Sequence, residues 1–325
     1  MNWNTKEYHT DRAKKKLRTT NTLKTLYLCP LAIILLLTQC TNLAEKNTYN
    51  FIFLGHTYDW QSPSGNKVDP RLEMIDYNKY DGVWLGGDIC ANTSLNPQTF
   101  KYLDALFDLK NPNSHFTLGN HDYRDNNLEP YFITTGRPDY YTSSFKSLVI
   151  SVLNTNLNSS DCENLNAQDR MLNSVCDTIK SASHYILLMH HQIFRDIEGI
   201  EAYRSHGELH HYPMNCDRND SYFHTTLYPR LAELEKRGID VVLVVGDTGW
   251  HKGSEAKCNN GINFLASGIN NSKHLNQDVS PSKFGDDMVL VFKYKAEQRE
   301  LSWEFKKLNG MVVLDKEGYF GGKMN

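Results

Sequence analysis

The sequence has no CxxC cysteine pair, no internal repeat and no apolar run long enough to cross a membrane. The missing CxxC pairs argue against a zinc site made of cysteines. A spanning helix needs about 20 apolar residues, and the run at residues 26–37 has only twelve. With 40% hydrophobic and 22% charged residues, the 325-residue chain is neither fibrous nor disordered throughout, and it can bury a substantial core.

The chain also lacks a large net charge, but its charge is unevenly spread. Residues 1–39 carry seven Lys/Arg and two acidic residues, which gives +5, whereas the whole chain carries −3, so the remainder carries −8. An acidic body has no bulk attraction for nucleic acid, and we predict no nucleic-acid partner. A phosphorylated ligand is still compatible, because a bound cation can reverse the local charge.

The basic N-terminal segment is typical of a targeting signal. Its apolar run, residues 26–37, suits the core of a signal peptide over residues 1–39. The run ends LTQC, which resembles a bacterial lipobox with Cys40 at the lipidated position, although Gln39 stands where a small residue is usual. We therefore expect an extracytoplasmic lipoprotein of the bacterial cell envelope, anchored to the membrane through lipidated Cys40 and a tether over residues 40–48. A secreted protein cleaved nearby and an uncleaved anchor are the alternatives.

Five cysteines follow the signal segment, and a location outside the cytoplasm permits disulfides. Cys162 and Cys176 lie close in sequence within a polar segment, and they are the pair we expect first. Cys216 with Cys258 is the second candidate pair. Cys90 follows an apolar strand, which indicates a buried free thiol.

Short apolar runs alternate with polar segments after residue 48, which predicts an α/β fold. The runs predict strands at 49–55, 82–88, 115–120, 140–145, 147–155, 184–191 and 239–247, and helices are predicted at 68–80, 96–110, 167–180 and 227–238. The tail predicts antiparallel strands at 288–296, 300–308 and 311–315. We expect one domain over residues 49–325. Its His- and Tyr-rich stretch at about 193–225 is an insertion that either covers the strand ends or is a solvated loop.

Five predicted strands end in side chains that can bind metal. These are His56, Asp88, the triplet Asn120, His121 and Asp122, the pair His190 and His191, and Asp247. Strand ends on one edge of an α/β sheet converge, and ligands bind there. Clustered buried carboxylates and imidazoles are costly without a compensating charge, which a cation supplies. Glycines precede four of these ends and let the backbone approach an ion closely.

The motifs GGD (86–88), GNHD (119–122) and LLMHH (187–191) resemble those of the calcineurin-like metallophosphoesterases in order, type and spacing. The resemblance covers about residues 50–252. It implies two mixed β-sheets packed face to face and flanked by helices, an α/β/β/α sandwich. It also implies a phosphomonoester or phosphodiester hydrolase with two divalent ions (Mn, Fe or Zn), metal-bound hydroxide as nucleophile, and a phosphorylated small-molecule or envelope substrate.

The resemblance assigns roles to five residues. Asp88 would bridge two ions, because ions about 3.5–4 Å apart need a shared carboxylate. Asn120 and His190 would bind one of these ions. His121 would stabilise the phosphoryl group or act as general acid, and Asp122 would orient the His121 imidazole. No Ser or Cys nucleophile motif is present, so no covalent phosphoenzyme is expected.

The first and last motifs depart from the family. Where Asp-x-His is expected, His56 takes the aspartate slot and Tyr58 the second-ligand slot. Where Gly-His-x-His is expected, Asp247 takes the first histidine slot, and His251 either replaces the second or is a surface residue. The exchange of one Asp for His and one His for Asp leaves the formal charge of the ligand set unchanged. We therefore expect a variant site that still holds metal, with Asp59 or water completing the first ion.

The sequence leaves alternatives open for the roles of His191 and Arg124 and for the class of function. His191 is interpreted as a neighbour of the ligands or substrate, and Arg124 either meets phosphate or is solvated. The rival to an enzyme is a non-catalytic cell-envelope binding module with a degenerate metal site. A purely structural role at the membrane surface is the third alternative.

Overall fold

The computed structural model describes residues 46–59, 62–124, 127–200, 212–217, 219–247, 254–269 and 286–312. The chain divides into two compact units, residues 1–45 and 46–325, and all described residues belong to the second. The predicted signal peptide, Cys40 and His251 lie outside the described residues. Among the described helices, none has both the length and the hydrophobicity to cross a membrane.

Two mixed β-sheets form the centre of this unit, with strand orders β11-β10-β1-β2-β3 and β4-β5-β6-β7-β9-β8. The first sheet comprises parallel β1 (Thr48–Leu54), β2 (Gly82–Leu85) and β3 (His115–Phe116), with antiparallel β10 (Met288–Lys295) and β11 (Glu300–Lys307). The second comprises parallel β5 (Leu148–Val152), β6 (His184–Met189), β7 (Asp240–Val245) and β9 (Ile262–Ser267), with antiparallel β4 (Tyr141–Phe145) and β8 (Ser254–Asn259) at its edges. The parallel strands of each sheet point the same way, so their carboxyl ends share an edge.

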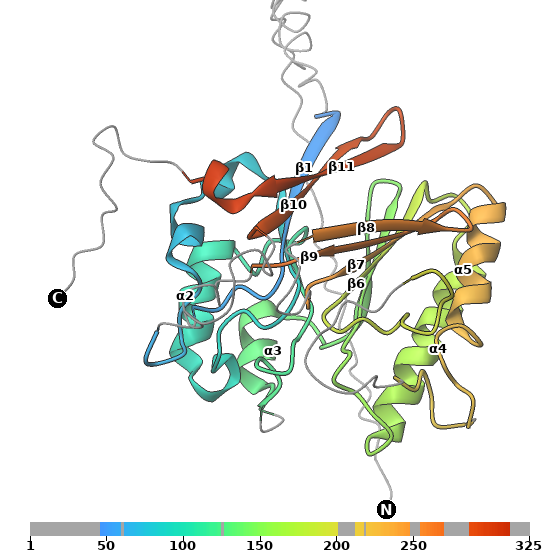
Figure 1. Ribbon diagram of the computed structural model, residues 1–325, viewed down its shortest axis with the longest axis horizontal. Coiled ribbons are helices and arrows are strands. Elements are labelled where there is room, and N and C mark those ends of the chain that lie inside the picture. Colours follow the sequence, from blue (N-terminus) through green and yellow to red (C-terminus); the bar gives the residue numbers. More distant parts are fainter. Residues whose placement is uncertain are drawn as a thin grey trace, which may run out of the picture. The chain divides into compact units, whose positions relative to one another are not determined.

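Helices cover the outer face of each sheet (Figure 1). The first sheet carries α2 (Pro97–Phe107) and α3 (Glu129–Thr135), and the second carries α4 (Cys162–Thr178) and α5 (Leu227–Lys236). Phe100, Leu103 and Phe107 recur at helical spacing and give α2 its buried face. The α/β/β/α sandwich implied by the sequence is confirmed.

Large apolar side chains fill the space between the two sheets. Phe51 and Trp84 of the first sheet stack with ring centroids 4.8 Å apart. The same cluster includes Ile186 and Val244 of the second sheet. Strands β6 and β7 are buried on both faces along nearly their whole length, which explains their continuous apolar runs. This packing fixes the strand ends of the two sheets next to one another.

Several elements differ from those predicted. Residues 68–80 form two 3-10 turns, η1 (Pro70–Met74) and η2 (Tyr77–Lys79), instead of an α-helix, because Asp69 and Asp76 cap each turn and Ile75 between them is extended. Two further 3-10 turns are η3 (Thr93–Leu95) and η7 (Leu308–Gly310). Residues 311–312 are not in a strand, and the rest of the predicted last strand lies outside the described residues.

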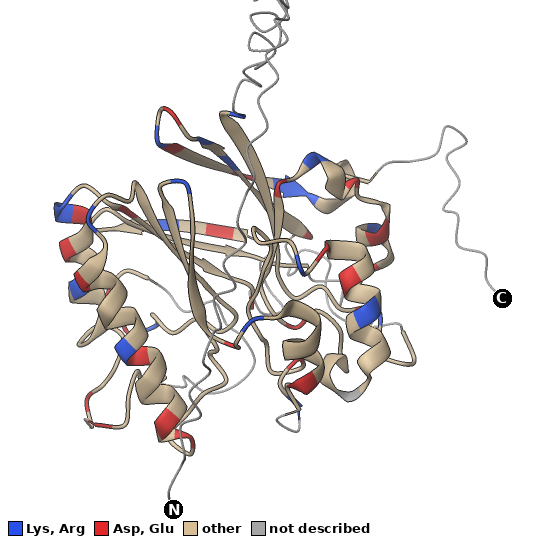
Figure 2. Ribbon diagram, turned by 180° about the vertical axis from the view of Figure 1, so that it is seen from behind, with Lys and Arg blue, Asp and Glu red and all other residues tan. Residues whose placement is uncertain are grey.

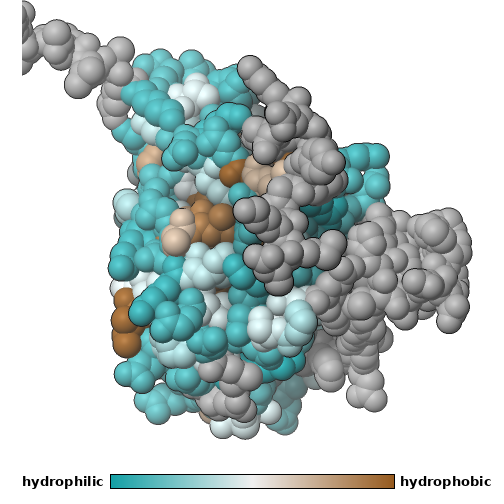
Figure 3. Space-filling view, turned by 90° about the vertical axis from the view of Figure 1, so that its left-hand side faces the viewer, coloured by the Kyte–Doolittle hydropathy of each residue, from teal (hydrophilic) through white to brown (hydrophobic). Residues whose placement is uncertain are grey.

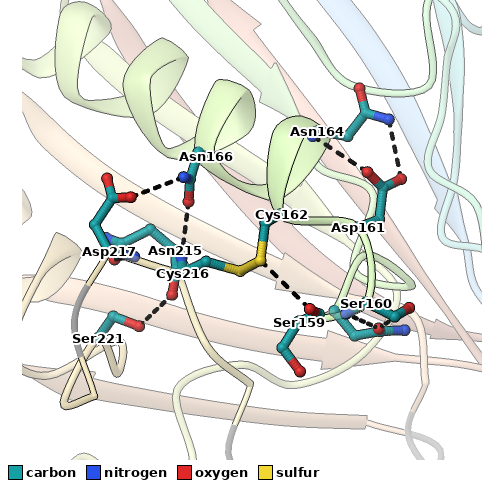
Figure 4. The surroundings of a disulfide bond; sticks show 11 residues. Ser159, Ser160, Asp161, Cys162, Asn164, Asn166, Asn215, Cys216, Asp217 and Ser221 are labelled. Carbon is teal, nitrogen blue, oxygen red and sulfur yellow. Dashed lines mark hydrogen bonds between the residues drawn. A yellow bond between two sulfur atoms is a disulfide. The ribbon is translucent and has the colours of Figure 1, made fainter.

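A disulfide joins Cys162, at the start of α4, to Cys216 in the predicted insertion (Figure 4). Both predicted pairs, Cys162 with Cys176 and Cys216 with Cys258, are therefore wrong. Cys162 and Cys176 lie on one helix, and fourteen residues span about 21 Å along a helix axis, which is too far for a bond. Cys90 is a buried free thiol, as predicted.

The described surface is polar and carries both signs of charge. Figure 2 shows basic and acidic residues interspersed on the helices that cover the sheets. Figure 3 shows a mostly hydrophilic face with small apolar patches. Among the described residues, the large apolar side chains with the greatest exposure are Phe132 and Ile133 of α3, at 41% and 72%.

Candidate metal centre

The polar ends of four strands, two from each sheet, meet at one place. His56 follows β1, Asp88 follows β2, His190 follows β6 and Asp247 follows β7. The main-chain N–H of His56 donates to the carbonyl of Gly87 at 3.0 Å, and that of Asp247 donates to His190 at 3.0 Å. In each sheet, the segments that follow the two neighbouring strands are thus joined by a main-chain hydrogen bond.

Glycines just before these residues let the two sheets approach each other. A Cβ atom added to Gly246 would lie 1.9 Å from the carbonyl oxygen of Gly86. One added to Gly55 would lie 2.5 Å from the Cα atom of Gly246. Any side chain at these positions would push the strand ends apart, so the glycines allow residues from both sheets to share one site.

Asp88 is the carboxylate on which three imidazoles converge. Its Oδ2 atom lies 3.5 Å from Nε2 of His190, 3.8 Å from Nε2 of His56 and 4.0 Å from Nε2 of His121. Its Oδ1 atom accepts a hydrogen bond of 2.8 Å from the main-chain N–H of His121. Asp88 is buried and has a φ of 53°, a left-handed conformation that is uncommon outside glycine. The backbone is therefore shaped to place this one carboxylate among the rings.

Hydrogen bonds at the far side of two rings determine which nitrogen faces Asp88. Nδ1 of His190 lies 2.8 Å from the carbonyl oxygen of Gly86, and Nδ1 of His56 lies 3.4 Å from that of Ile269. A carbonyl oxygen only accepts, so both Nδ1 atoms carry a hydrogen, and Nε2 of each ring has a lone pair for a metal ion once it carries no proton. The buried Nε2 of His190 makes no hydrogen bond. A lone pair that faces a carboxylate oxygen in this way fits a cation bound between them.

His190 also belongs to a compact group of three possible metal donors. One ligand atom each from His190, His191 and Asp247 lie within 4.8 Å of one another. Nδ1 of His191 is held by Thr155, 2.9 Å from its hydroxyl and 3.2 Å from its carbonyl oxygen. Imidazole and carboxylate donors suit Mn, Fe or Zn. The residues present therefore fit a divalent ion.

The insertion contributes one wall to this group. The Tyr212 ring stacks on His191 with centroids 5.5 Å apart. Four residues later, Cys216 is joined to α4 by the disulfide, and its main-chain N–H donates to Asn166 at 2.7 Å (Figure 4). The disulfide thus helps to position the aromatic ring beside His191.

The prediction that Asp122 orients His121 is wrong. The buried Asp122 carboxylate accepts hydrogen bonds from the main-chain N–H groups of Asp88 (2.6 Å), Ile89 (3.2 Å) and Gly119 (3.0 Å) and from the Thr93 hydroxyl (2.5 Å). Nδ1 of His121 instead lies 2.9 Å from the Ala91 carbonyl oxygen and 2.9 Å from Nη2 of Arg124. Asp122 joins the turn after β2 to the turn after β3, and so supports Asp88 from behind.

Asp88 also governs the ionisation of the rings around it. Burial acts to lower the pKa of His190, but the Asp88 carboxylate outweighs burial and raises that pKa to about 9. Burial acts to raise the pKa of Asp88, but His190 and the other imidazoles hold it well below its usual range. Burial lowers the pKa of His56, and burial together with His190 lowers the pKa of His191 to about 4. Asp88 therefore favours a positive charge at His190, carried by a proton or by a cation in its place, whereas burial favours the neutral rings of His56 and His191.

A profile described as calcineurin-like phosphoesterase matches residues 59–250, more than half of the chain. The chain belongs to the calcineurin-like phosphoesterase family. Among solved structures, this chain is similar to one titled GAP50, the anchor in the inner membrane complex of Plasmodium, at 14% sequence identity and a TM-score of 0.46. The similarity covers 84% of this chain and 91% of that chain. No curated protein matches the chain.

The remaining candidate residues have different surroundings. Asn120 is exposed, and its side chain has no hydrogen-bond partner among the described residues. Tyr58 is buried, and its ring packs against those of His56 and His121, with centroids 4.7 and 5.0 Å apart. Both His56 and Tyr58 precede the matched range, in keeping with the altered first motif. His251 lies outside the described residues.

Proposed function

We propose that the protein hydrolyses phosphoesters at a divalent-metal centre built around Asp88 and His190. The convergence of three Nε2 atoms on one buried oxygen of Asp88, in a chain of the calcineurin-like phosphoesterase family, carries this proposal. A divalent ion bound there would act as a Lewis acid toward phosphoryl oxygens and lower the pKa of a bound water. The resemblance implies two such ions, and Asn120 and His251 would be further ligands.

His121 and Arg124 are the residues that contact the phosphoryl group in this proposal. The His121 side chain is 18% exposed, so it is accessible from solvent while its Nε2 faces Asp88. Arg124 is exposed and lies beside Nδ1 of His121, and its Nη1 atom donates to Asn92 at 3.1 Å. The guanidinium suits phosphoryl oxygens, and the imidazole suits proton donation to a leaving group.

The substrate is a phosphomonoester or a phosphodiester in this proposal. A lipoprotein anchored through Cys40, as expected from the sequence, would hold the centre outside the cytoplasm. A phosphorylated small molecule or a component of the cell envelope would meet it there. The acidic body supports neither a nucleic-acid partner nor a nucleic-acid substrate.

Hydrolysis of an aryl phosphomonoester and an aryl phosphodiester with added Mn²⁺ or Zn²⁺ tests the proposal. We expect Asp88→Ala and His121→Ala to lower kcat by about 100-fold or more. His224→Ala is the matched control, because His224 is a surface histidine, 46% exposed, that pairs with Asp196. Equal inactivity of the wild type and all variants with every metal and substrate would overturn the enzymatic function and favour the non-catalytic binding module.

A further inference from the structure

The side chains around Asp88 fall into two groups. In the first group, ligand atoms of His190, His191 and Asp247 lie within 4.8 Å of one another. In the second group, the Tyr58 ring packs against the rings of His56 and His121. Within the part of the chain that the structure describes, His190, His191 and Asp247 form the one compact group of three such donors. The first group therefore offers the ligands of an ion, and the second contains an aromatic ring.

The backbone holds Tyr58 firmly in this position. The preceding Thr57 donates its main-chain N–H to the carbonyl of Asp88 at 3.0 Å and its hydroxyl to that of Ile89 at 2.9 Å. Tyr58 itself forms an antiparallel bridge with Val68 and is 2% exposed. Because the backbone at Thr57 and Tyr58 is held by these contacts, moving the buried ring would cost packing free energy. The ring therefore excludes an ion from the space that it fills.

The charge of the site also favours one ion. Asp88 and Asp247 carry two negative charges, which balance one divalent cation. The oxygens of the third nearby carboxylate, Asp122, already accept four hydrogen bonds and face away from the ion. A second divalent ion would leave two uncompensated positive charges beside the buried Asp88, which is costly in a low-dielectric environment.

We propose that the centre holds a single divalent ion with His190, His191 and Asp247 as ligands, and that Tyr58 fills the place of a second ion. Ligand atoms of one such ion lie about 2.0–2.2 Å from it, so any two are at most about 4.4 Å apart. The distance of 3.5 Å between Oδ2 of Asp88 and Nε2 of His190 meets this limit, so Asp88 can serve as a fourth donor. The other three ligand atoms, within 4.8 Å of one another, need to close only slightly around the ion. His191 thereby becomes a ligand instead of a neighbour. This inference rests on the proposed metal-dependent function and refines it.

Counting bound ions tests the inference without reference to activity. The full-length protein is stripped with a chelator, reloaded with Mn²⁺ or Zn²⁺, and examined by native mass spectrometry and elemental analysis. We expect one equivalent in the wild type and in the control His224→Ala, and Mn²⁺ affinity weaker by about 100-fold in His191→Ala. Asp247→Asn probes the same ion without touching Thr155, and circular dichroism checks that each variant folds. In Tyr58→His we expect a second equivalent.

The outcomes separate this inference from the proposed function. Two equivalents in the wild type, with the electron paramagnetic resonance spectrum of a coupled Mn²⁺ pair, would overturn the single ion but leave a phosphoesterase. No bound ion would overturn the metal-dependent function itself. One equivalent that folded His191→Ala and Asp247→Asn retain with unchanged affinity would overturn the ligand assignment. One equivalent in Tyr58→His would overturn the role given to Tyr58.

Discussion

Nε2 of His190 lies 3.5 Å from Oδ2 of Asp88, on the side of the ring opposite its hydrogen bond to Gly86. His190 comes from the six-stranded sheet, and Asp88 and Gly86 follow β2 of the five-stranded sheet. The ring therefore bridges the two halves of the sandwich. A donor pair that depends on two separately formed sheets responds to any change that moves them apart.

Gly246→Ala should separate the two sheets at the site. The added Cβ would meet the Gly86 carbonyl oxygen at 1.9 Å, and backbone at that distance has to move. We expect a loss of about 3 kcal/mol or more in the free energy of unfolding, measured by urea denaturation. Gly310→Ala is the control, since an added Cβ there has no neighbour within 4 Å and should change stability little. Equal stability of the two variants would contradict the close approach.

The main effect of Asp122→Ala should be a loss of folding stability, and not a change in a step of the reaction. The change leaves three main-chain N–H groups without their acceptor, whereas the Thr93 hydroxyl can still donate to the Cys90 carbonyl oxygen. Each unsatisfied buried group costs about 1–3 kcal/mol, so we expect a loss of about 3–5 kcal/mol after relaxation. Asp122→Asn retains one acceptor oxygen and should lose less. A pH–rate profile altered by Asp122→Asn with unchanged stability would instead support direct contact with His121.

Removal of the disulfide should loosen the insertion. In the chain-entropy picture, a bond that closes a loop of 54 residues stabilises by about 4 kcal/mol, although measured values centre on about 2–4 kcal/mol. We expect Cys162→Ser to lose about 2–4 kcal/mol and to increase hydrogen exchange around Tyr212. Cys258→Ser, at an exposed free cysteine, is the control. A variant as stable as Cys258→Ser would show that the bond does not constrain the fold.

His115 should make stability depend on pH. Burial, assisted by Arg137, lowers the pKa of His115 to about 3, whereas the unfolded chain has about 6.5. The folded-state pKa is depressed, so the unfolded state takes up the proton first. The stability from the neutral ring is fully present above pH 6.5 and is lost as the pH falls toward 3.

Urea unfolding of the wild type and His115→Gln at pH 7 and pH 5 measures this effect. Between these pH values, the wild type should lose about 2 kcal/mol more than the variant. Groups that titrate in both proteins cancel in this comparison. Parallel pH dependence of the two proteins would mean that His115 is accessible to protons in the native state.

The elements that sequence reasoning found are those with local signals. Strands β6 and β7 are continuous apolar runs, and α2 shows helical spacing through Phe100, Leu103 and Phe107. The β8–β9 hairpin was not predicted, because β8 has the mostly polar sequence SEAKCN and therefore shows no apolar run. Its turn does carry a signal, since Asn260 and Gly261 both have positive φ, as an Asn–Gly hairpin turn requires.

The sequence predicted which residues belong to the site better than it predicted the contacts that these residues make. The ends of the apolar strands indicated Asp88, His190 and Asp247, because parallel strands align their carboxyl ends. Most partners of Asp122 could not be read from sequence, because the main-chain N–H groups of Asp88 and Ile89 and the hydroxyl of Thr93 lie 29–34 residues earlier. The Cys162–Cys216 bond likewise depends on how the insertion folds back on α4, which no local pattern encodes.

An anomalous difference map from a crystal of the Mn²⁺- or Zn²⁺-loaded protein, measured at the absorption edge of the metal, tests the central claim most directly. The account predicts a peak that contacts Nε2 of His190 and a carboxylate oxygen of Asp247, with Asp88 beside it. No peak there, or a peak only at a distant surface, would contradict it.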